Sequence, residues 1–369
     1  MIDTDTPPAG PPEAALGWPG SAAARDEDDE FIRRAAPYRR ELLVHCYRML
    51  GSLHDAEDLV QETYLRAWRG YGRFEERSTL RLWLYRIATS ACLTALQHRS
   101  RRTLPVGLGA PSAEPDRPLP AAGLAESVWV QPLPDTLADD PAAIVASRES
   151  VRLAFIAALQ HLPARQRAVL ILRDVLAWRA AEVAELLGTT TVAVNSALRR
   201  ARGQLADAAP LRDELTEPED PRRRALLDRY TTAFENADLP ELLRLLRDDV
   251  VLEMPPHLAW FSGRTQVTRF LAAHVLGPGT RRFALVPTGA NGQPAVAGYL
   301  LGANGLWHAH ALQVLTMRAS GISHIVSFND PALFPGFALP PVLRGPQLNR
   351  LPLSSTQIPL SSGCLSGLP

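Results

Sequence analysis

Apolar residues recur at helical spacing in two separate stretches of the chain, at about residues 26–102 and 141–208. In each stretch they return every three or four residues, which places them on one face of a helix. The clearest stripes are Leu80, Leu84, Ile87 and Ala91 in the first stretch and Val194, Leu198, Ala201 and Leu205 in the second. This pattern predicts two all-α domains.

Segments rich in proline, glycine and small residues separate and flank these domains. Proline interrupts helices and sheets, so such segments predict linkers and tails. We assign residues 1–25 to a disordered N-terminus, 26–103 to the first helical domain, 104–146 to a flexible linker, 147–208 to the second helical domain, 209–221 to a second linker, 222–335 to a third domain and 336–369 to a disordered tail. In the third domain two helices precede alternating strands, which predicts an α+β fold.

The bulk composition excludes some classes of protein. With 369 residues, 46% of them apolar, the chain is long enough for two or three buried cores. Its 39 basic and 39 acidic residues cancel, which argues against a protein that coats nucleic acid without specificity. Three widely spaced cysteines predict neither disulfides nor a metal site, and no apolar run is long enough to span a membrane. These features favour a cytoplasmic protein without cofactor, metal or membrane partner.

A helix, a glycine turn and a second helix follow one another between residues 181 and 205. Gly188 suits the left-handed turn after the first of these helices, and threonines at 189–191 provide caps for the second. The polar side of the second helix carries Thr190, Thr191, Asn195, Ser196, Arg199 and Arg200. Arginine pairs with guanine and asparagine with adenine in the major groove, so we interpret this unit as a DNA-reading helix-turn-helix. An ordinary helical hairpin with a solvated arginine face is the alternative.

The first helical domain has two unusual faces. Asp55, Asp58 and Glu62 share one helix face, where like charges cost about 0.2–0.5 kcal/mol per pair. This cost points to a basic partner, and the alternative is a solvated acidic face that is partly relieved by Arg66. On the next helix Trp83 stands in a row with polar and basic residues, which suits unpaired DNA because bases stack on rings while arginine holds phosphate. The alternative is that Trp83 belongs to the core.

Together these segments resemble the extracytoplasmic-function group of bacterial RNA polymerase sigma factors. The likeness rests on residues 54–63, 82–93, 162–167, 182–188 and 194–202. It implies that core RNA polymerase is bound by Asp55, Asp58, Gln61 and Glu62. It also implies that the −10 element is read by Arg81, Trp83, Arg86, Ser90, His98, Arg99, Arg101 and Arg102, and the −35 element by Thr190, Thr191, Asn195, Ser196, Arg199 and Arg200.

The third domain resembles the SnoaL-like fold, a cone in which a bent sheet wraps a helix around a pocket. The likeness rests on the turn at 248–250 and the closing run at 326–331. A subset of these sigma factors has such a domain at this place, which implies a built-in regulator that is able to dock on the linker run 129–135. Candidate pocket residues are His257, Trp260, His308 and His310. His308 and His310 share a strand face, but no third metal ligand is evident in the sequence.

We therefore predict a sigma factor that binds core RNA polymerase and promoter DNA and is not an enzyme. Two alternatives stay open: a fused isomerase-like or cyclase-like enzyme with a pocket histidine as base, and a one-component regulator that binds duplex DNA without polymerase. The acidic face and the Trp83 row favour the sigma factor, because a duplex-only regulator needs neither. A small-molecule ligand of the third domain is left open as a further partner.

Overall fold

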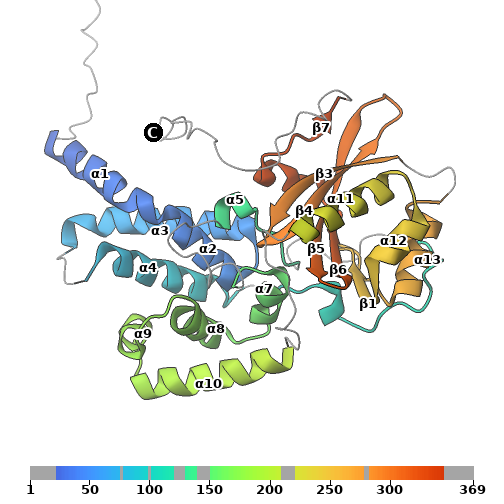
Figure 1. Cartoon of the computed structure of the whole chain (residues 1–369). Helices are drawn as coiled ribbons and strands as arrows, with labels where there is room; N and C mark the ends of the chain where they lie inside the picture. The colour runs from blue at the N-terminus through green and yellow to red at the C-terminus, as the bar shows by residue number, and fades with distance from the viewer. Residues whose placement is uncertain are drawn as a thin grey trace, which may run out of the picture.

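The structure is a computed structural model that describes residues 22–74, 78–98, 101–119, 129–138, 150–208, 221–277 and 282–344. The helical half and the sheet half of the chain lie side by side (Figure 1). The tails expected at either end and the linker expected before the third domain lie, at residues 1–21, 345–369 and 209–220, outside the described residues.

The first helical unit covers the predicted residues but begins earlier than expected: α1 starts at Ala22, so the expected disorder of residues 22–25 is corrected. Its helices are α1 (Ala22–Ala35), α2 (Arg39–Leu50), α3 (Leu53–Gly70) and α4 (Leu80–Ala95). Gly51, with a φ of 71°, ends α2, and the Ser52 hydroxyl accepts a hydrogen bond from the Asp55 amide at 3.2 Å at the start of α3. Leu80 and Leu84 of the predicted stripe are buried, and α2 contacts both α3 and α4. The unit is an all-α bundle with α2 at its centre.

The second helical unit contains the predicted helix-turn-helix. Its helices are α7 (Leu153–Gln160), α8 (Ala164–Leu170) with a π-helical continuation (Ile171–Val175), α9 (Ala180–Leu187) and α10 (Thr191–Ala208). Gly188, with a φ of 59°, makes the turn between α9 and α10. The predicted stripe on α10 is buried at all four positions, Val194, Leu198, Ala201 and Leu205. This burial leaves the opposite side of α10 open to solvent.

The stretch between the two helical units is packed over two runs, which differs from the flexible linker expected at 104–146. Residues 101–119 contain a short 3₁₀ helix (Pro105–Gly107), and residues 129–138 end in α5 (Asp135–Ala138). The Val130 amide donates to the Thr103 carbonyl at 3.1 Å and joins the two runs. Trp129, Val130 and Leu133 are buried, because apolar side chains between the prolines fill a gap between neighbouring domains.

The third domain combines three helices with a curved sheet. Its elements are α11 (Pro221–Glu235), α12 (Leu239–Leu245), β1 (Leu246–Glu253), β2 (Trp260–Ser262), α13 (Arg264–His274), β3 (Phe283–Ala290), β4 (Gln293–Leu301), β5 (Trp307–Arg318), β6 (Gly321–Phe328), a 3₁₀ helix (Pro331–Phe337) and β7 (Val342–Leu343). The strand order is β2-β1-β6-β5-β4-β3, with β7 paired to β5, and β1 runs parallel to β6 while the other pairs are antiparallel. The predicted α+β fold is confirmed.

The domain extends beyond the boundary expected at residue 335. Leu339 and Leu343 are buried, and strand β7 pairs with β5 through Trp307 and His308. The apolar side chains of this segment cover the outer part of the sheet, which the proline-rich composition concealed. The expected disorder of residues 336–344 is therefore corrected.

One hydrophobic cluster runs through all three units. It joins Tyr47 of α2, Leu133 of the linker, Ile156 of α7 and Leu198 of α10 with the sheet residue Leu312. A second cluster lies inside the third domain, between the sheet and its three helices. The units therefore share a core as well as having separate ones.

Candidate functional site

Helix α3 presents the acidic side chains expected to bind polymerase. The Asp58 carboxylate is exposed and lies 3.8 Å from His54 Nε2. Gln61 is also exposed, whereas Glu62 is half-buried and accepts a hydrogen bond from Arg66 Nε at 2.6 Å. A carboxylate and an amide thus remain accessible to a basic partner.

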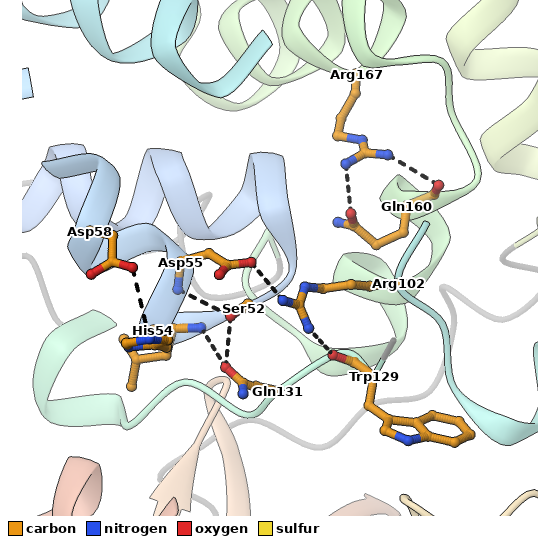
Figure 2. A network of polar contacts seen from close by, with 10 residues as sticks. Ser52, His54, Asp55, Asp58, Arg102, Trp129, Gln131, Gln160 and Arg167 are labelled. Carbon is orange, nitrogen blue, oxygen red and sulfur yellow. Dashed lines mark hydrogen bonds and ion pairs between the residues drawn. The ribbon is translucent and has the colours of Figure 1, made fainter. Parts of the chain in front are cut away.

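Asp55 and Arg102, which we assigned to two different partners, bind each other instead. Arg102 Nη2 donates to Asp55 Oδ2 at 2.6 Å, and the side chains are 10% exposed for Asp55 and 9% for Arg102 (Figure 2). Arg102 Nη1 also donates to the Trp129 carbonyl at 2.9 Å. Asp55 turns inward because the first turn of α3 packs against the linker, where Gln131 Oε1 accepts from the Ser52 hydroxyl at 2.8 Å. The assignment of this pair to polymerase and to the −10 element is corrected.

Two residues of the expected −10 face are held by contacts within the first helical unit. Arg81 donates to both carboxylate oxygens of Glu41 at 2.8–3.0 Å. The Trp83 ring is half-buried and packs on Phe74, with 4.9 Å between the ring centroids. Trp83 therefore fits both interpretations made from the sequence, a core residue and a ring available to DNA. One part of its side chain packs in the core and another part is accessible.

The remainder of the −10 face lies along α4 and just beyond it. Ser90 and His98 are exposed. Arg101 is exposed and hydrogen-bonds to His161 of the second helical unit. Arg99 lies outside the described residues.

Helix α9 of the helix-turn-helix lies against this face of α4. Arg86 Nη2 is 3.4 Å from Glu185 Oε1 and 3.2 Å from the Glu185 carbonyl oxygen. A small cavity between the two helices is lined by Leu82 and Trp83 on one side and by Leu186 on the other. In this arrangement the row of Trp83 and Arg86 is partly covered.

The reading face of α10 is open by comparison. Thr190, Thr191, Asn195, Arg199 and Arg200 are exposed, and Ser196 is half-buried. Thr190 Oγ1 accepts from the Ala193 amide at 3.2 Å and caps the helix. Sequence reasoning missed Val192, which is 77% exposed in the first turn of this face and is an apolar group of the kind that contacts a thymine methyl. Its position off the buried stripe was the signal that could have identified it.

Buried polar residues join the two helical units. Arg167 of α8 donates to Gln160 Oε1 at 2.6 Å, to the Leu162 carbonyl at 3.1 Å and to the Met49 carbonyl of α2 (Figure 2 shows the Gln160 contact). Burial lowers the pKa of Arg167 to about 10. Arg48 of α2 donates to the Ser150 hydroxyl at 2.7 Å, which ties the same helix to the start of the second unit. The helical pattern carried no signal for these contacts.

A hairpin of the third domain reaches into the junction between the helical units. Asn291 and Gly292 form the β3–β4 turn with φ angles of 57° and 67°, as a two-residue hairpin of type I′ requires. Asn291 is fully buried. Its Nδ2 donates to the Tyr47 hydroxyl at 2.8 Å and to the Val151 carbonyl at 2.6 Å, and its Oδ1 accepts from the Leu133 amide at 2.9 Å. One side chain therefore bonds to the first unit, the linker and the entry to the second unit.

A cavity of about 410 Å³ is lined mainly by residues of the third domain. His257 and His310 line it, as expected, together with Gln313 and Asn329. Trp260 and His308 do not line it, which corrects their assignment. Trp260 Nε1 donates to the Gly109 carbonyl at 3.0 Å, and His308 lies beside Asn304 of the β4–β5 turn. Among the described residues no three side chains of His, Cys, Asp or Glu come together as metal ligands.

Three parts of the chain match known families: residues 35–102 match Sigma-70 region 2, residues 152–205 match Sigma-70 region 4, and residues 227–325 match the SnoaL-like domain. The ECF RNA polymerase sigma factor SigG of Mycobacterium tuberculosis is 51% identical over 326 residues, 87% of each chain. SigJ of the same species is 29% identical over 322 residues, 82% of this chain and 92% of SigJ. The crystal structure of SigJ covers 84% of this chain and 100% of its own, at 25% identity and a TM-score of 0.54.

Region 2, region 4 and a cone-shaped third domain define the class, a sigma factor with a fused SnoaL-like domain. The chain belongs to the extracytoplasmic-function family of RNA polymerase sigma factors. Its function is to direct promoter-specific transcription, with core RNA polymerase and promoter DNA as partners, and it is not an enzyme. In the part of the chain that the structure describes, no helix combines the length and apolarity needed to cross a bilayer.

Proposed function

We propose that the SnoaL-like domain restrains this sigma factor by holding regions 2 and 4 together. The names of the two promoter elements place them about 25 base pairs apart, which is roughly 85 Å at about 3.4 Å per base pair. Arg86 of region 2 lies 3.4 Å from Glu185 of region 4, so the −10 face and the helix-turn-helix are in contact. Reading both elements at once requires the two regions to separate.

The buried Asn291 side chain is the observation that carries this proposal. It bonds to Tyr47 in region 2, to Leu133 in the linker and to the Val151 carbonyl ahead of region 4. Withdrawing the hairpin removes the Asn291 partner of the Leu133 amide and of the Val151 carbonyl, and each buried polar group left without a partner costs about 1–3 kcal/mol. The Tyr47 hydroxyl keeps its hydrogen bond to the Gln131 carbonyl at 2.7 Å. The next residue but one, Gln293, also accepts from the Leu153 amide of α7 at 3.0 Å. The hairpin thus stabilises the closed arrangement of both regions.

The test is transcription with core RNA polymerase and the full chain carrying Asn291→Gly. Glycine adopts the positive φ of this turn without strain, so the change removes the side-chain hydrogen bonds and keeps the hairpin. We expect promoter-specific transcript to rise severalfold over the wild-type chain. Asn304→Gly is the matched control, because Asn304 precedes Gly305 in the exposed β4–β5 turn. Equal transcript from Asn291→Gly, Asn304→Gly and the wild type would contradict the restraint.

We further propose that Asp58, Gln61 and Glu62 dock on a basic surface of core RNA polymerase. Charge complementarity of this kind favours association with a basic surface. Asp58→Arg and Glu62→Arg should each weaken core binding by about fivefold, which corresponds to about 1 kcal/mol. Asp228→Arg, at an exposed position of α11, controls for the change in net charge. Core binding that is insensitive to both α3 variants would remove this surface from the interface.

The DNA contacts follow from the open and covered faces. We propose that Thr191, Asn195, Ser196, Arg199 and Arg200 read the −35 element, and that Thr190 caps their helix. For the −10 element we propose Trp83, Arg86, Ser90, His98 and the neighbouring arginines at 81, 99 and 101.

Because RNA polymerase acts on the bacterial chromosome, we infer a cytoplasmic location. A small molecule in the third domain is the input to the restraint that we consider next.

A further inference from the structure

The cavity of the SnoaL-like domain has one wall that does not belong to that domain. Pro118 and Leu119, from the linker between regions 2 and 4, line it together with strands and helices of the cone. Leu119 also packs against the hydrophobic cluster of the third domain. Anything that occupies the cavity therefore contacts the linker directly.

The linker run 106–119 is fastened along the rim of the cone. The Val106 amide donates to Glu253 Oε2 at 2.7 Å, and the Ser112 amide donates to the Trp260 carbonyl at 2.8 Å. Farther along, His274 Nε2 lies 3.1 Å from the Pro115 carbonyl oxygen, and Asp116 forms an ion pair with Arg269. These contacts bring the end of the run to the cavity.

The lining of the cavity defines the chemistry of a ligand. Its walls are mainly aromatic and aliphatic, with Phe234, Phe270 and Phe283 among them. None of the lining residues, all of which are described, is Asp, Glu, Lys or Arg, so no carboxylate, ammonium or guanidinium group faces the cavity. The ionisable side chains among the lining residues are His257, His274 and His310. The volume of about 410 Å³ lies within the range of about 300–1,000 Å³ typical of small-molecule sites.

Two amide side chains, Gln313 and Asn329, are among the polar groups that line the site. Gln313 Oε1 accepts from the Tyr230 hydroxyl at 2.9 Å, and Asn329 Oδ1 accepts from the Ser327 hydroxyl at 3.1 Å. Within the described part of the chain, no hydrogen bond occupies the NH₂ groups of these two amides, and both residues line the cavity. Each can donate to a carbonyl or hydroxyl oxygen of a ligand.

We propose that the cavity binds an uncharged, mainly apolar molecule with a carbonyl or hydroxyl oxygen, and that this molecule fixes the linker run 106–119 against the cone. The role of this site in regulation depends on the restraint proposed above. Occupancy strengthens the contact of Leu119 with the third domain and so stabilises the closed arrangement of regions 2 and 4. An empty cavity leaves that contact weaker.

Prodan, an uncharged naphthalene that carries a carbonyl group, is a suitable fluorescent probe for the full chain. We expect saturable binding at one site per chain, and weaker binding of the anionic naphthalene 8-anilinonaphthalene-1-sulfonate. Ala311→Leu places a larger side chain at a lining position and should weaken Prodan binding by at least about tenfold, or about 1.4 kcal/mol. Thermal unfolding checks that the variant is folded. Equal affinity in both chains, no binding to the wild type, or tighter binding of the sulfonate would overturn the site as described.

Hydrogen exchange then tests the link to the linker. Prodan should slow amide exchange in residues 106–119 of the wild-type chain severalfold. Leu119→Ser should lose this protection, whereas Leu108→Ser, at a 48% exposed position of the same run, should keep it. Unchanged exchange at saturating Prodan would overturn the coupling.

Both measurements are made without polymerase, so they are independent of the proposed restraint. Probe binding and linker protection in a chain whose transcription ignores Asn291→Gly would refute the restraint alone. Hairpin-dependent transcription in a chain that binds no Prodan would refute the ligand site alone.

Discussion

Helices α4 and α10 carry the two faces expected to read promoter DNA, and their surroundings differ. On the polar face of α10, Ser196 is half-buried and the other residues expected to read DNA are exposed, with Val192 beside them. The face of α4 is partly covered by α9, and its Arg86 is paired with Glu185. The α10 face expected to read the −35 element is therefore accessible in the free chain. The α4 face expected to read the −10 element becomes fully accessible only when α9 moves away from it.

This difference has a physical basis in what each helix packs on. Helix α10 buries one apolar stripe against α8 and α9, and nothing in the described part of the chain covers the opposite side. Helix α4 contacts the core of region 2 on one side and the second helical unit on another. When one DNA-reading face is exposed and the other is partly covered, promoter recognition can be controlled at the junction between regions 2 and 4. The largest expected effects accordingly lie in the buried contacts there.

The largest effect is expected at the buried Asp55–Arg102 pair. Asp55→Asn leaves the Arg102 charge buried without its partner, which costs about 3–5 kcal/mol for a pair of this kind. Asp58→Asn removes an exposed carboxylate on the same helix and should change the free energy of unfolding by less than about 0.5 kcal/mol. Urea unfolding of the two variants measures the difference. Equal losses in the free energy of unfolding would mean that Asp55 is exposed like Asp58 and is not buried with Arg102.

The open face should show its effect in promoter recognition instead of stability. Arg199→Ala should weaken recognition of the −35 element by about 1–3 kcal/mol, because an exposed arginine on the reading face contacts a base or a phosphate. Holoenzyme binding to promoter fragments with intact and altered −35 sequences measures this loss. Arg202→Ala is the control, since Arg202 is already paired with Asp174 at 2.7 Å. A larger loss for Arg202→Ala would mean that the reading face is misplaced.

The support beneath α4 should be sensitive to pH. Burial, followed by the positive charge of Arg48, lowers the pKa of His45 to about 3, and its Nε2 lies 2.9 Å from Thr89 Oγ1 of α4. Below about pH 6.5 the unfolded chain takes up a proton that the folded chain does not, so the free energy of unfolding falls. At pH 5 the loss is about 2 kcal/mol, at about 1.36 kcal/mol per pH unit.

Urea unfolding at pH 7 and pH 5 measures this loss. His45→Gln removes the titrating group and should be less stable at pH 7 but lose less stability on acidification. The same pH dependence in both chains would assign the effect to other groups.

The smallest effect is expected at the contact between α9 and the face of α4 that is expected to read the −10 element. Arg86 and Glu185 are 49% and 66% exposed, so Glu185→Arg should change the free energy of unfolding by less than about 1 kcal/mol. The repulsion it introduces should still improve binding of a single-stranded −10 probe by up to about fivefold, or about 1 kcal/mol. Glu114→Arg, at another exposed acid paired at 3.3 Å, is the control. Equal probe binding by both variants would show that α9 does not limit access.

The features that the sequence predicts well are those with local causes. The stripe on α10, the Gly188 turn and the order of the three domains depend on residues a few positions apart, and all are confirmed. Asp55 was misassigned because its partner Arg102 is 47 residues away, and helical spacing shows only that Asp55 shares a face with Asp58. Likewise, the Asn291–Gly292 pair signals a tight turn, but its contact with Tyr47 spans 244 residues. Periodicity alone carries no record of such long-range contacts.

The linker and the cavity show the same limit. Prolines at 132 and 134 predict a break in helices and sheets, and they say nothing about burial of the neighbouring Trp129 and Leu133. For the cavity, the sequence identified His257 and His310, whereas Trp260 turns to the linker. Which side of a strand faces a cavity depends on sheet curvature, which residue alternation does not encode.

We expect regions 2 and 4 to be held together in the free chain and to separate when polymerase binds. Spin labels at Ser90 of α4 and Gln204 of α10, both exposed, measure the distance between the regions after Cys364 is replaced by serine. We expect one short distance in the free chain, which lengthens by tens of Å with core RNA polymerase, as the roughly 85 Å between promoter elements requires. An unchanged distance in the polymerase complex, or a broad range of long distances in the free chain, would contradict it.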